Sequence, residues 1–109
     1  MAAVVPALNE ATHIAGVIQR MPAFVDDVIV VDDHSNDNTA EVAGGAGDPR
    51  VQVVRHVQRR GVGGATVSGM QRALELEADL VVKVDGDGQM DPGRIESLLA
   101  PLVHEGYAY

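Results

Sequence analysis

Two carboxylates stand one residue apart in the segment Val-Val-Lys-Val-Asp-Gly-Asp-Gly-Gln-Met-Asp-Pro, residues 81–92. Alternate residues of an extended chain point the same way, so Asp85 and Asp87 can converge on one cation. Gln89 offers a neutral oxygen at the next alternate position, and Gly86 lets a ligand approach the backbone closely. The pattern predicts a metal or ligand site. The alternative is a polar loop whose Asp91 caps a following helix.

An EF-hand loop is a second interpretation, because five oxygen-bearing side chains fall at loop positions one, three, five, seven and twelve: Asp85, Asp87, Gln89, Asp91 and Glu96. Met90 stands where that loop requires glycine, and an apolar strand pattern precedes the segment instead of a helix. The sequence therefore disfavours calcium binding of this type.

A second acidic pair, Asp32 and Asp33, follows the continuous β-branched run of residues 28–31. Such a run is typical of a strand buried on both faces, which would deliver both carboxylates to the ligand edge of a sheet. Carboxylates there can accept hydrogen bonds from ribose hydroxyls or from a base N–H. The alternative is an Asx-rich turn that caps the next helix.

Glycines recur in the segment Gly61-Val-Gly-Gly-Ala-Thr-Val-Ser-Gly69, at the start of a helical pattern. Their N–H groups could cradle a phosphate, or the small residues could allow close packing of helix on sheet. Nearby, Arg55, Arg59 and Arg60 form the densest positive group, which would meet a diphosphate or lie in solvent.

The four histidines show no metal-ligand spacing and are expected to be surface or packing residues: His13, His34, His56 and His104. His34 and His56 stand out only because they flank the presumed ligand edge. Ser35 and Ser68 lack the sequence context of a catalytic nucleophile.

Apolar runs alternate with helical patterns along the chain. Strands are predicted at residues 2–5 (stopped by Pro6), 28–32, 51–55 and 80–84, with a further strand opening at 107–109. Helices are predicted at residues 11–21 (capped by Asn9), from Asn38 (with capping-box spacing to Glu41) to the glycines at 44–47, at 65–76, and from Asp91 to about 103. This order predicts an α/β fold, an open and mostly parallel sheet with helices on both faces. Ligands of such folds bind outside the carboxyl ends of the strands, where both acidic pairs fall.

The 109 residues suit one domain, and the 46% apolar share allows a buried core. The net charge of −8 disfavours nucleic acid and anionic membrane surfaces as partners and suits a metal-bound phosphate. The chain has no cysteine, no transmembrane run and no signal peptide, so a cytoplasmic location is expected. A sheet left with an open edge favours self-association, so a homo-oligomer is a further expectation.

Three segments together resemble family 2 glycosyltransferases, which have the nucleotide-sugar-binding GT-A fold with a Rossmann-like half. Residues 5–10 are similar to the first-strand motif Pro-x-Tyr/Phe-Asn-Glu, and residues 30–35 match Val-Asp-Asp-x-Ser. Residues 85–89 match the metal motif Asp-x-Asp-x-Gln. The order and spacing agree, and the dolichol- or polyprenyl-phosphate sugar transferases are the most similar branch. Two positions depart from the pattern: Leu8 replaces an aromatic ring, and Arg59 replaces an asparagine.

The resemblance implies a role for each matching residue. The nucleoside would be bordered by Pro6, Asn9, Glu10, Asp32 and Asp33. Asp85 would face the ribose and diphosphate, and Asp87 with Asp85 and Gln89 would hold Mg²⁺ or Mn²⁺. The implied activity is inverting, metal-dependent transfer of sugar from a nucleotide-diphosphate sugar, with a polyprenyl phosphate as the acceptor.

The family's catalytic domains are about twice as long, so residues 1–109 would form a single nucleotide-sugar-binding domain, truncated before the acceptor half. The general base is then expected beyond Tyr109, the fragment would bind donor only weakly, and the parent protein would associate with the cytoplasmic face of a membrane. Two alternatives are a receiver-like phosphoacceptor module using Asp32 and Asp33, and a nucleotidyltransferase. The first needs an acidic pair after the first strand, and the second needs a glycine-rich signature where Pro6 stands.

Overall fold

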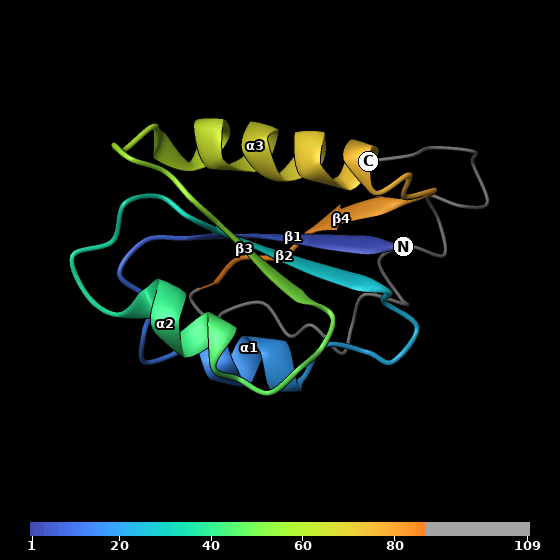
Figure 1. The fold of residues 1–109 in the computed structure, drawn as a ribbon, viewed down its shortest axis with the longest axis horizontal. Coiled ribbons are helices and arrows are strands. Elements are labelled where there is room, and N and C mark those ends of the chain that lie inside the picture. The colour runs from blue at the N-terminus through green and yellow to red at the C-terminus, as the bar shows by residue number, and fades with distance from the viewer. Residues whose placement is uncertain (87–109) are drawn as a thin grey trace.

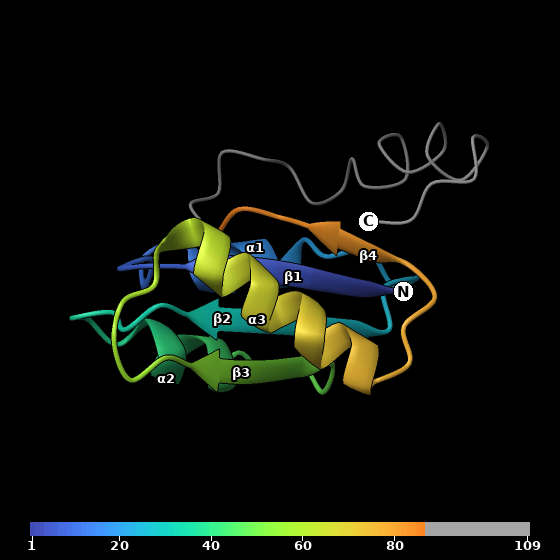
Figure 2. The ribbon, with the colours of Figure 1, turned by 90° about the horizontal axis from the view of Figure 1, so that it is seen from above.

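A computed structural model describes residues 1–86 as a parallel sheet covered by helices (Figure 1). The strands are β1 (Ala2–Ala7), β2 (Asp27–Asp32), β3 (Val51–Arg55) and β4 (Val81–Lys83). The helices are α1 (Ile14–Gln19), α2 (Thr39–Gly44) and α3 (Gly61–Glu75). All pairings are parallel and the strand order is β3-β2-β1-β4, as Figure 2 shows from above. The predicted fold class is confirmed.

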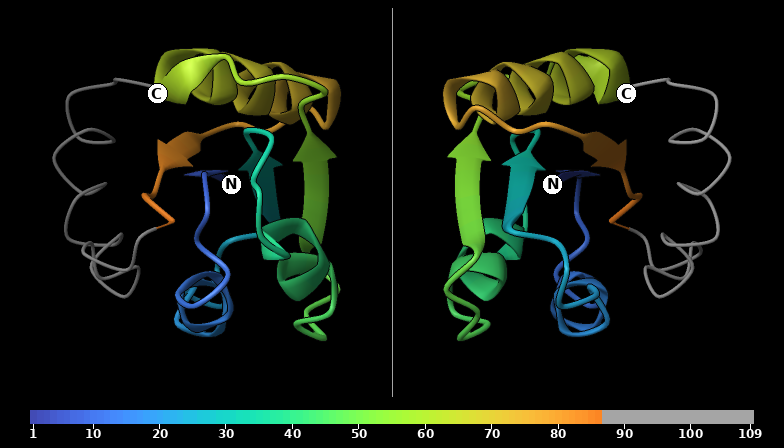
Figure 3. Two further views of the ribbon diagram at one scale, coloured as in Figure 1. Left: turned by 90° about the vertical axis from the view of Figure 1, so that its left-hand side faces the viewer. Right: turned by 90° about the vertical axis from the view of Figure 1, so that its right-hand side faces the viewer.

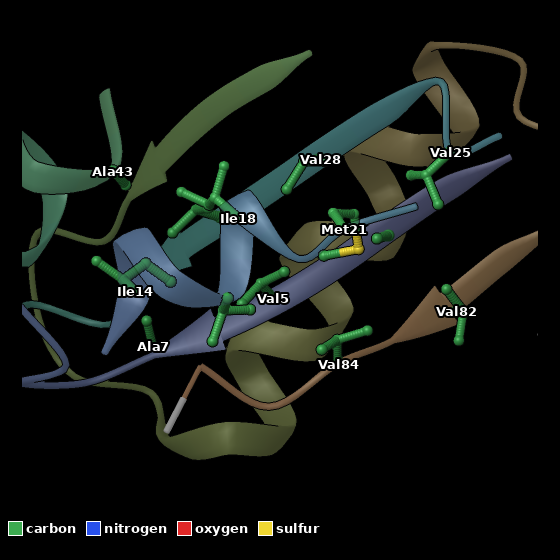
Figure 4. Close-up of a cluster of buried hydrophobic side chains, with 13 residues drawn as sticks. Val5, Ala7, Ile14, Ile18, Met21, Val25, Val28, Ala43, Val82 and Val84 are labelled. Atoms are coloured by element: carbon green, nitrogen blue, oxygen red, sulfur yellow. The ribbon is translucent and has the colours of Figure 1, made fainter. Parts of the chain in front are cut away.

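Helices lie on both faces of the sheet, with α3 on one side and α1 and α2 on the other (Figures 1 and 3). Successive residues of a strand point to opposite faces, and β1 is buried along its whole length. Ala3, Val5 and Ala7 therefore meet α1, together with Val28 and Val30 of β2 (Figure 4). The alternate residues of both strands face α3 and form the second core layer.

Helix α3 approaches the sheet closely because its contact position is Gly69. A Cβ atom at that residue would overlap Cγ1 of Val4 and would lie 3.2 Å from Cγ2 of Val31. Close packing of helix on sheet, one of the two interpretations of the glycine-rich segment, is thus confirmed at Gly69.

Strand β1 runs through Pro6 to Ala7, so the prediction that Pro6 stops it was wrong. The Pro6 carbonyl accepts a hydrogen bond from Gly86 N at 3.3 Å, so this residue faces β4, and the β1–β4 ladder has ended at Val4. The missing N–H of proline therefore removes at most one hydrogen bond at the end of a ladder. Pairing with β2 continues on the other side to Ala7.

One predicted helix cap, Asn9, was wrong, and the other, Asn38, has the predicted position without a side-chain bond. Asn9 has φ of 56° and α1 begins only at Ile14, after a turn in which the Ile14 amide donates to the Glu10 carbonyl. Asn38 precedes α2 without a side-chain bond, because Asp37 accepts the Thr39 amide at 3.0 Å instead. Residues 61–64 belong to α3, four residues earlier than predicted.

The expected helix from Asp91 and the strand at 107–109 lie outside the described residues. Among residues 1–86, no helix is long and apolar enough to cross a membrane.

Substitution of Gly69 by Ala is expected to lower the free energy of unfolding by about 1–3 kcal/mol, since the added methyl overfills the contact with Val4. Gly63→Ala in the same helix is the matched control, because its Cβ would meet no atom within 4 Å. It is expected to leave stability unchanged or raise it by up to about 1 kcal/mol. Urea unfolding measures both, and equal effects of the two substitutions would contradict the close-contact argument.

Candidate functional site

Two adjoining hollows lie over the carboxyl ends of the strands. The first is lined by Pro6, Ala7, Leu8, Asp33, Gly61, Val62 and Ala65. The second is lined by Pro6, Leu8, Glu10, Val62, Asp85 and Gly86. They share Pro6, Leu8 and Val62, so together they form one cleft with Asp33 on one side and Glu10 and Asp85 on the other. This is the ligand edge that the sequence predicts.

Asp33 is the anchor of the cleft, and its side chain is only 5% exposed. Its Oδ1 accepts hydrogen bonds from His56 Nδ1 and from the Arg60 amide, both at 2.8 Å. Its Oδ2 accepts one from the Gly61 amide at 2.9 Å. Burial alone would raise the pKa of Asp33, but the hydrogen bond from His56 and those from the two amides hold this pKa below its ordinary value. The carboxylate is therefore ionised at neutral pH.

His56 comes directly after β3 and is 6% exposed. Its Nδ1 meets Asp33 and its Nε2 lies 2.8 Å from Ser68 Oγ on α3. Of the two roles that the sequence predicts for His56, surface or packing, the structure shows packing, with a bond to the cleft carboxylate in addition, and it gives Ser68 a partner that its sequence context does not indicate. The available signal was their position, since His56 follows the carboxyl end of a strand and Ser68 lies on the helix above it.

Asp32 is fully buried and lines neither hollow. Its Oδ1 accepts hydrogen bonds from the Ser35 amide at 3.0 Å and from the Ser35 hydroxyl. Its Oδ2 accepts none from the described residues, and the Arg55 guanidinium lies 3.5 Å away as the counter-charge. Asp32 thus holds the turn after β2, which is the Asx-turn interpretation, while Asp33 faces the cleft.

The loops after β1 and β2 are joined by reciprocal hydrogen bonds. The Asn9 amide donates to Ser35 Oγ at 2.9 Å, and Asn9 Oδ1 accepts the Asn36 amide at 2.8 Å. The Glu10 amide donates to Thr39 Oγ1 at 2.9 Å, and Glu10, whose Oε2 lies 3.0 Å from His13 Nδ1, lines the second hollow. Asn9 therefore fixes the loop, and it lines neither hollow.

Asp85 follows β4, and its side chain is 53% exposed, 3.6 Å from Lys83 Nζ. Gly86 seats this loop against β1, because a Cβ there would lie 3.0 Å from the Pro6 carbonyl oxygen. Residues 1–86 contain no cluster of three side chains suited to a metal. The other two expected ligands, Asp87 and Gln89, lie outside the described residues. The donor set of carboxylate and amide oxygens fits a hard divalent cation.

Parts of the positive and glycine-rich segments are bound to carboxylates in the described chain, and a contact of the arginines with diphosphate stays a prediction. Arg55 is paired with Asp32 and lies 3.7 Å from Glu41, and the arginines at 59 and 60 are exposed. The amides of Arg60 and Gly61 are bound to Asp33, so they are not free to cradle a phosphate.

The sequence matches the model of glycosyl transferase family 2 over residues 2–109. The chain belongs to this family. The receiver-like and nucleotidyltransferase alternatives are therefore set aside.

The names of two relatives describe sugar transfer to a lipid phosphate. The UDP-N-acetylglucosamine–dolichyl-phosphate N-acetylglucosaminyltransferase of Methanococcus voltae is 32% identical over 97% of this chain and 48% of its own length. The undecaprenyl-phosphate mannosyltransferase of Micrococcus luteus is 35% identical over 88% of this chain and 41% of its own length. The chain thus spans less than half the length of these relatives.

A similar solved structure is glucosyl-3-phosphoglycerate synthase of Mycobacterium tuberculosis in complex with UDP. It has a TM-score of 0.72 and 32% identity over 94% of this chain and 39% of its own. The same enzyme with Mn²⁺, UDP and glucosyl-3-phosphoglycerate has a TM-score of 0.70 and 31% identity over 93% of this chain and 38% of its own. The parallel sheet of this chain is that of the family's GT-A fold.

Asp33→Asn is expected to lower the free energy of unfolding at pH 7 by about 1–3 kcal/mol, because an amide accepts fewer of the three hydrogen bonds. The pKa of Asp33 is lower in the folded chain, so its contribution is present above about pH 4 and is lost as the pH falls through the lowered pKa. The gap between parent and variant should therefore close below about pH 4.

Urea unfolding at several pH values between 7 and 2.5 measures this gap. The control is Asp79→Asn, since Asp79 is an exposed carboxylate between α3 and β4, at the opposite edge of the sheet. A gap that stays constant down to pH 2.5 would contradict the ionised, hydrogen-bonded state of Asp33.

Proposed function

We propose that the chain is the donor-binding part of a glycosyltransferase and that it binds a nucleoside-diphosphate sugar, with UDP as the nucleotide. The observation that carries this is the placement of an ionised carboxylate, Asp33, in a cleft whose walls include Leu8 and Val62. Aliphatic walls can cover the faces of a base, and a carboxylate oxygen can accept a base N–H. The UDP complex of the similar synthase supports this assignment.

The second hollow continues the site toward the ribose and diphosphate. Glu10 and Asp85 line it, and both can accept hydrogen bonds from ribose hydroxyls. Pro6 lies between the two hollows and would contact the nucleoside, whereas Asn9 and Asp32 would act through the loops that they hold.

Asp87 and Gln89, with Asp85, would hold Mg²⁺ or Mn²⁺. A divalent cation there neutralises charge that develops on the leaving diphosphate. The similar synthase with Mn²⁺ and UDP supports this choice of metal.

The names of two relatives support a polyprenyl or dolichyl phosphate as the acceptor. In the inverting reaction that we propose, an acceptor oxygen attacks the anomeric carbon and the nucleoside diphosphate leaves. The general base would lie beyond Tyr109, and the parent protein would meet its lipid acceptor at the cytoplasmic face of a membrane.

Calorimetric titration of the 109-residue chain with UDP and with GDP, each with and without Mn²⁺, tests the donor site. We expect UDP to bind only weakly without Mn²⁺ and more tightly with it. Asp87→Ala should remove the gain from Mn²⁺, because the metal would lose a carboxylate ligand.

Asp79→Ala is the matched control, because it deletes one exposed carboxylate at the opposite edge of the sheet and should leave the Mn²⁺ gain unchanged. A folded chain that binds neither nucleotide with Mn²⁺ would overturn the donor site. An Asp87→Ala variant that keeps the full gain would overturn the metal assignment alone.

We also propose self-association through β3, which lies at one end of the strand order and, among residues 1–86, has one neighbour, β2. An edge strand presents N–H and C=O groups that a second copy can pair with. Sedimentation velocity at increasing concentration should show a shift toward a dimer, and a monomer at the highest concentration would contradict it.

A further inference from the structure

Three polar side chains form a hydrogen-bonded row from α3 to the cleft. Ser68 Oγ lies 2.8 Å from His56 Nε2, and His56 Nδ1 lies 2.8 Å from Asp33 Oδ1. The imidazole is enclosed between β3 and α3, with 5% of its side chain exposed. Neither His56 nor Ser68 lines either hollow, so the row reaches a ligand only through Asp33.

These hydrogen bonds determine which nitrogen of the imidazole carries the proton. Asp33 is ionised, because its pKa is held below the ordinary value, and an ionised carboxylate can only accept. Nδ1 must therefore carry a proton. In the neutral imidazole Nε2 is then an acceptor, and the Ser68 hydroxyl donates to it.

The same row decides how much of the Asp33 carboxylate is left for a ligand. The two oxygens together offer about four acceptor positions. His56 and the Arg60 amide fill both positions on Oδ1, and the Gly61 amide fills one on Oδ2. One position on Oδ2 remains unused by the described residues.

We propose that His56, oriented by Ser68, is a positioning residue for base recognition, which turns Asp33 so that one Oδ2 acceptor position faces the base. This inference rests on the proposed donor site. One acceptor matches the single ring N–H of uracil, at N3. Guanine presents two adjacent donors, at N1 and at its amino group, and would leave one of them unpaired in the cleft at a cost in affinity.

Two substitutions separate the two nitrogens of the ring. Asn carries its amide nitrogen at the same number of bonds from Cα as His Nδ1, so His56→Asn keeps a donor toward Asp33. Gln carries its amide group at the reach of Nε2, so His56→Gln keeps a partner for Ser68 and loses the donor toward Asp33. The pair is therefore matched in chemistry and differs in which contact survives.

The measurement is the Kd of UDP and of UDP methylated at uracil N3, both with Mn²⁺, by calorimetry. For the parent chain we expect the methylated probe to bind about tenfold or more weakly, since it lacks the donor. His56→Gln should raise the Kd of UDP by a similar factor and leave the Kd of the methylated probe within about twofold of its value for the parent chain. His56→Asn should stay within about threefold of the parent chain for both probes. If His56 only stabilised the fold, His56→Gln would weaken the binding of both probes by the same factor.

The ring tautomer supplies a readout that needs no nucleotide. In ¹⁵N NMR spectra of the ligand-free chain, recorded in the pH range where the His56 imidazole is neutral, Nδ1 should carry the proton and Nε2 should carry none. The opposite tautomer would overturn the proposal, and so would equal losses for both probes in His56→Gln or unchanged binding of UDP.

The two levels of the argument fail differently. Absence of UDP binding by the folded parent chain overturns the proposed donor site, and with it any role of His56 in base recognition. The role of His56 alone is overturned if the parent chain binds UDP more tightly than the methylated probe and the His56→Gln variant binds UDP as tightly as the parent chain does.

Discussion

The buried charge of Asp33 is the constraint on which the ligand edge depends. A carboxylate removed from water is costly unless it is hydrogen-bonded, and here three N–H groups meet it. These donors come from the end of β3 and the start of α3, while the Asp33 amide donates to the Ala7 carbonyl at 2.9 Å. One residue, through its side chain and its amide, therefore ties β1, β2, β3 and α3 together, and none of these ends can shift without exposing an unpaired group.

The parallel sheet explains why residues far apart in the sequence reach one cleft. All four strands run the same way, so their carboxyl ends bring Pro6, Asp33 and Asp85 to one edge. Glycine sets the spacing of the layers at two places. Gly69 lets α3 lie on β1, and Gly86 lets the loop after β4 lie against the Pro6 carbonyl. The cleft is thus a product of the topology and of two missing side chains.

Much of this architecture could be predicted from the residues. The β-branched run before Asp32 and the alternation of apolar runs with helical patterns indicated the strands, helices and fold class, and within residues 1–86 the order of elements and the fold class are confirmed. The sequence places the adjacent carboxylates Asp32 and Asp33 at the ligand edge, but it does not predict that their side chains make different contacts. Asp32 turns inward to Ser35 and Asp33 faces the cleft, because successive residues leave a strand in opposite directions. The contact of His56 with Ser68 depends on α3 lying above it, and the position of His56 after a strand is the one sequence signal that points to it.

Pro6 has a consequence for the energetics of binding. The strand order changes direction along the chain at β1, which has β2 on one side and β4 on the other, and crevices form at such switch points. Pro6 faces β4 just past the last paired residue, and it has no N–H with which to extend the ladder. Beyond the ladder a hydrogen bond from the Gly86 amide to the Pro6 carbonyl, at 3.3 Å, joins the two sides, and Pro6 can donate no further one in return. The crevice is therefore preorganised on the side of the Pro6 nitrogen, because backbone pairing cannot close it there.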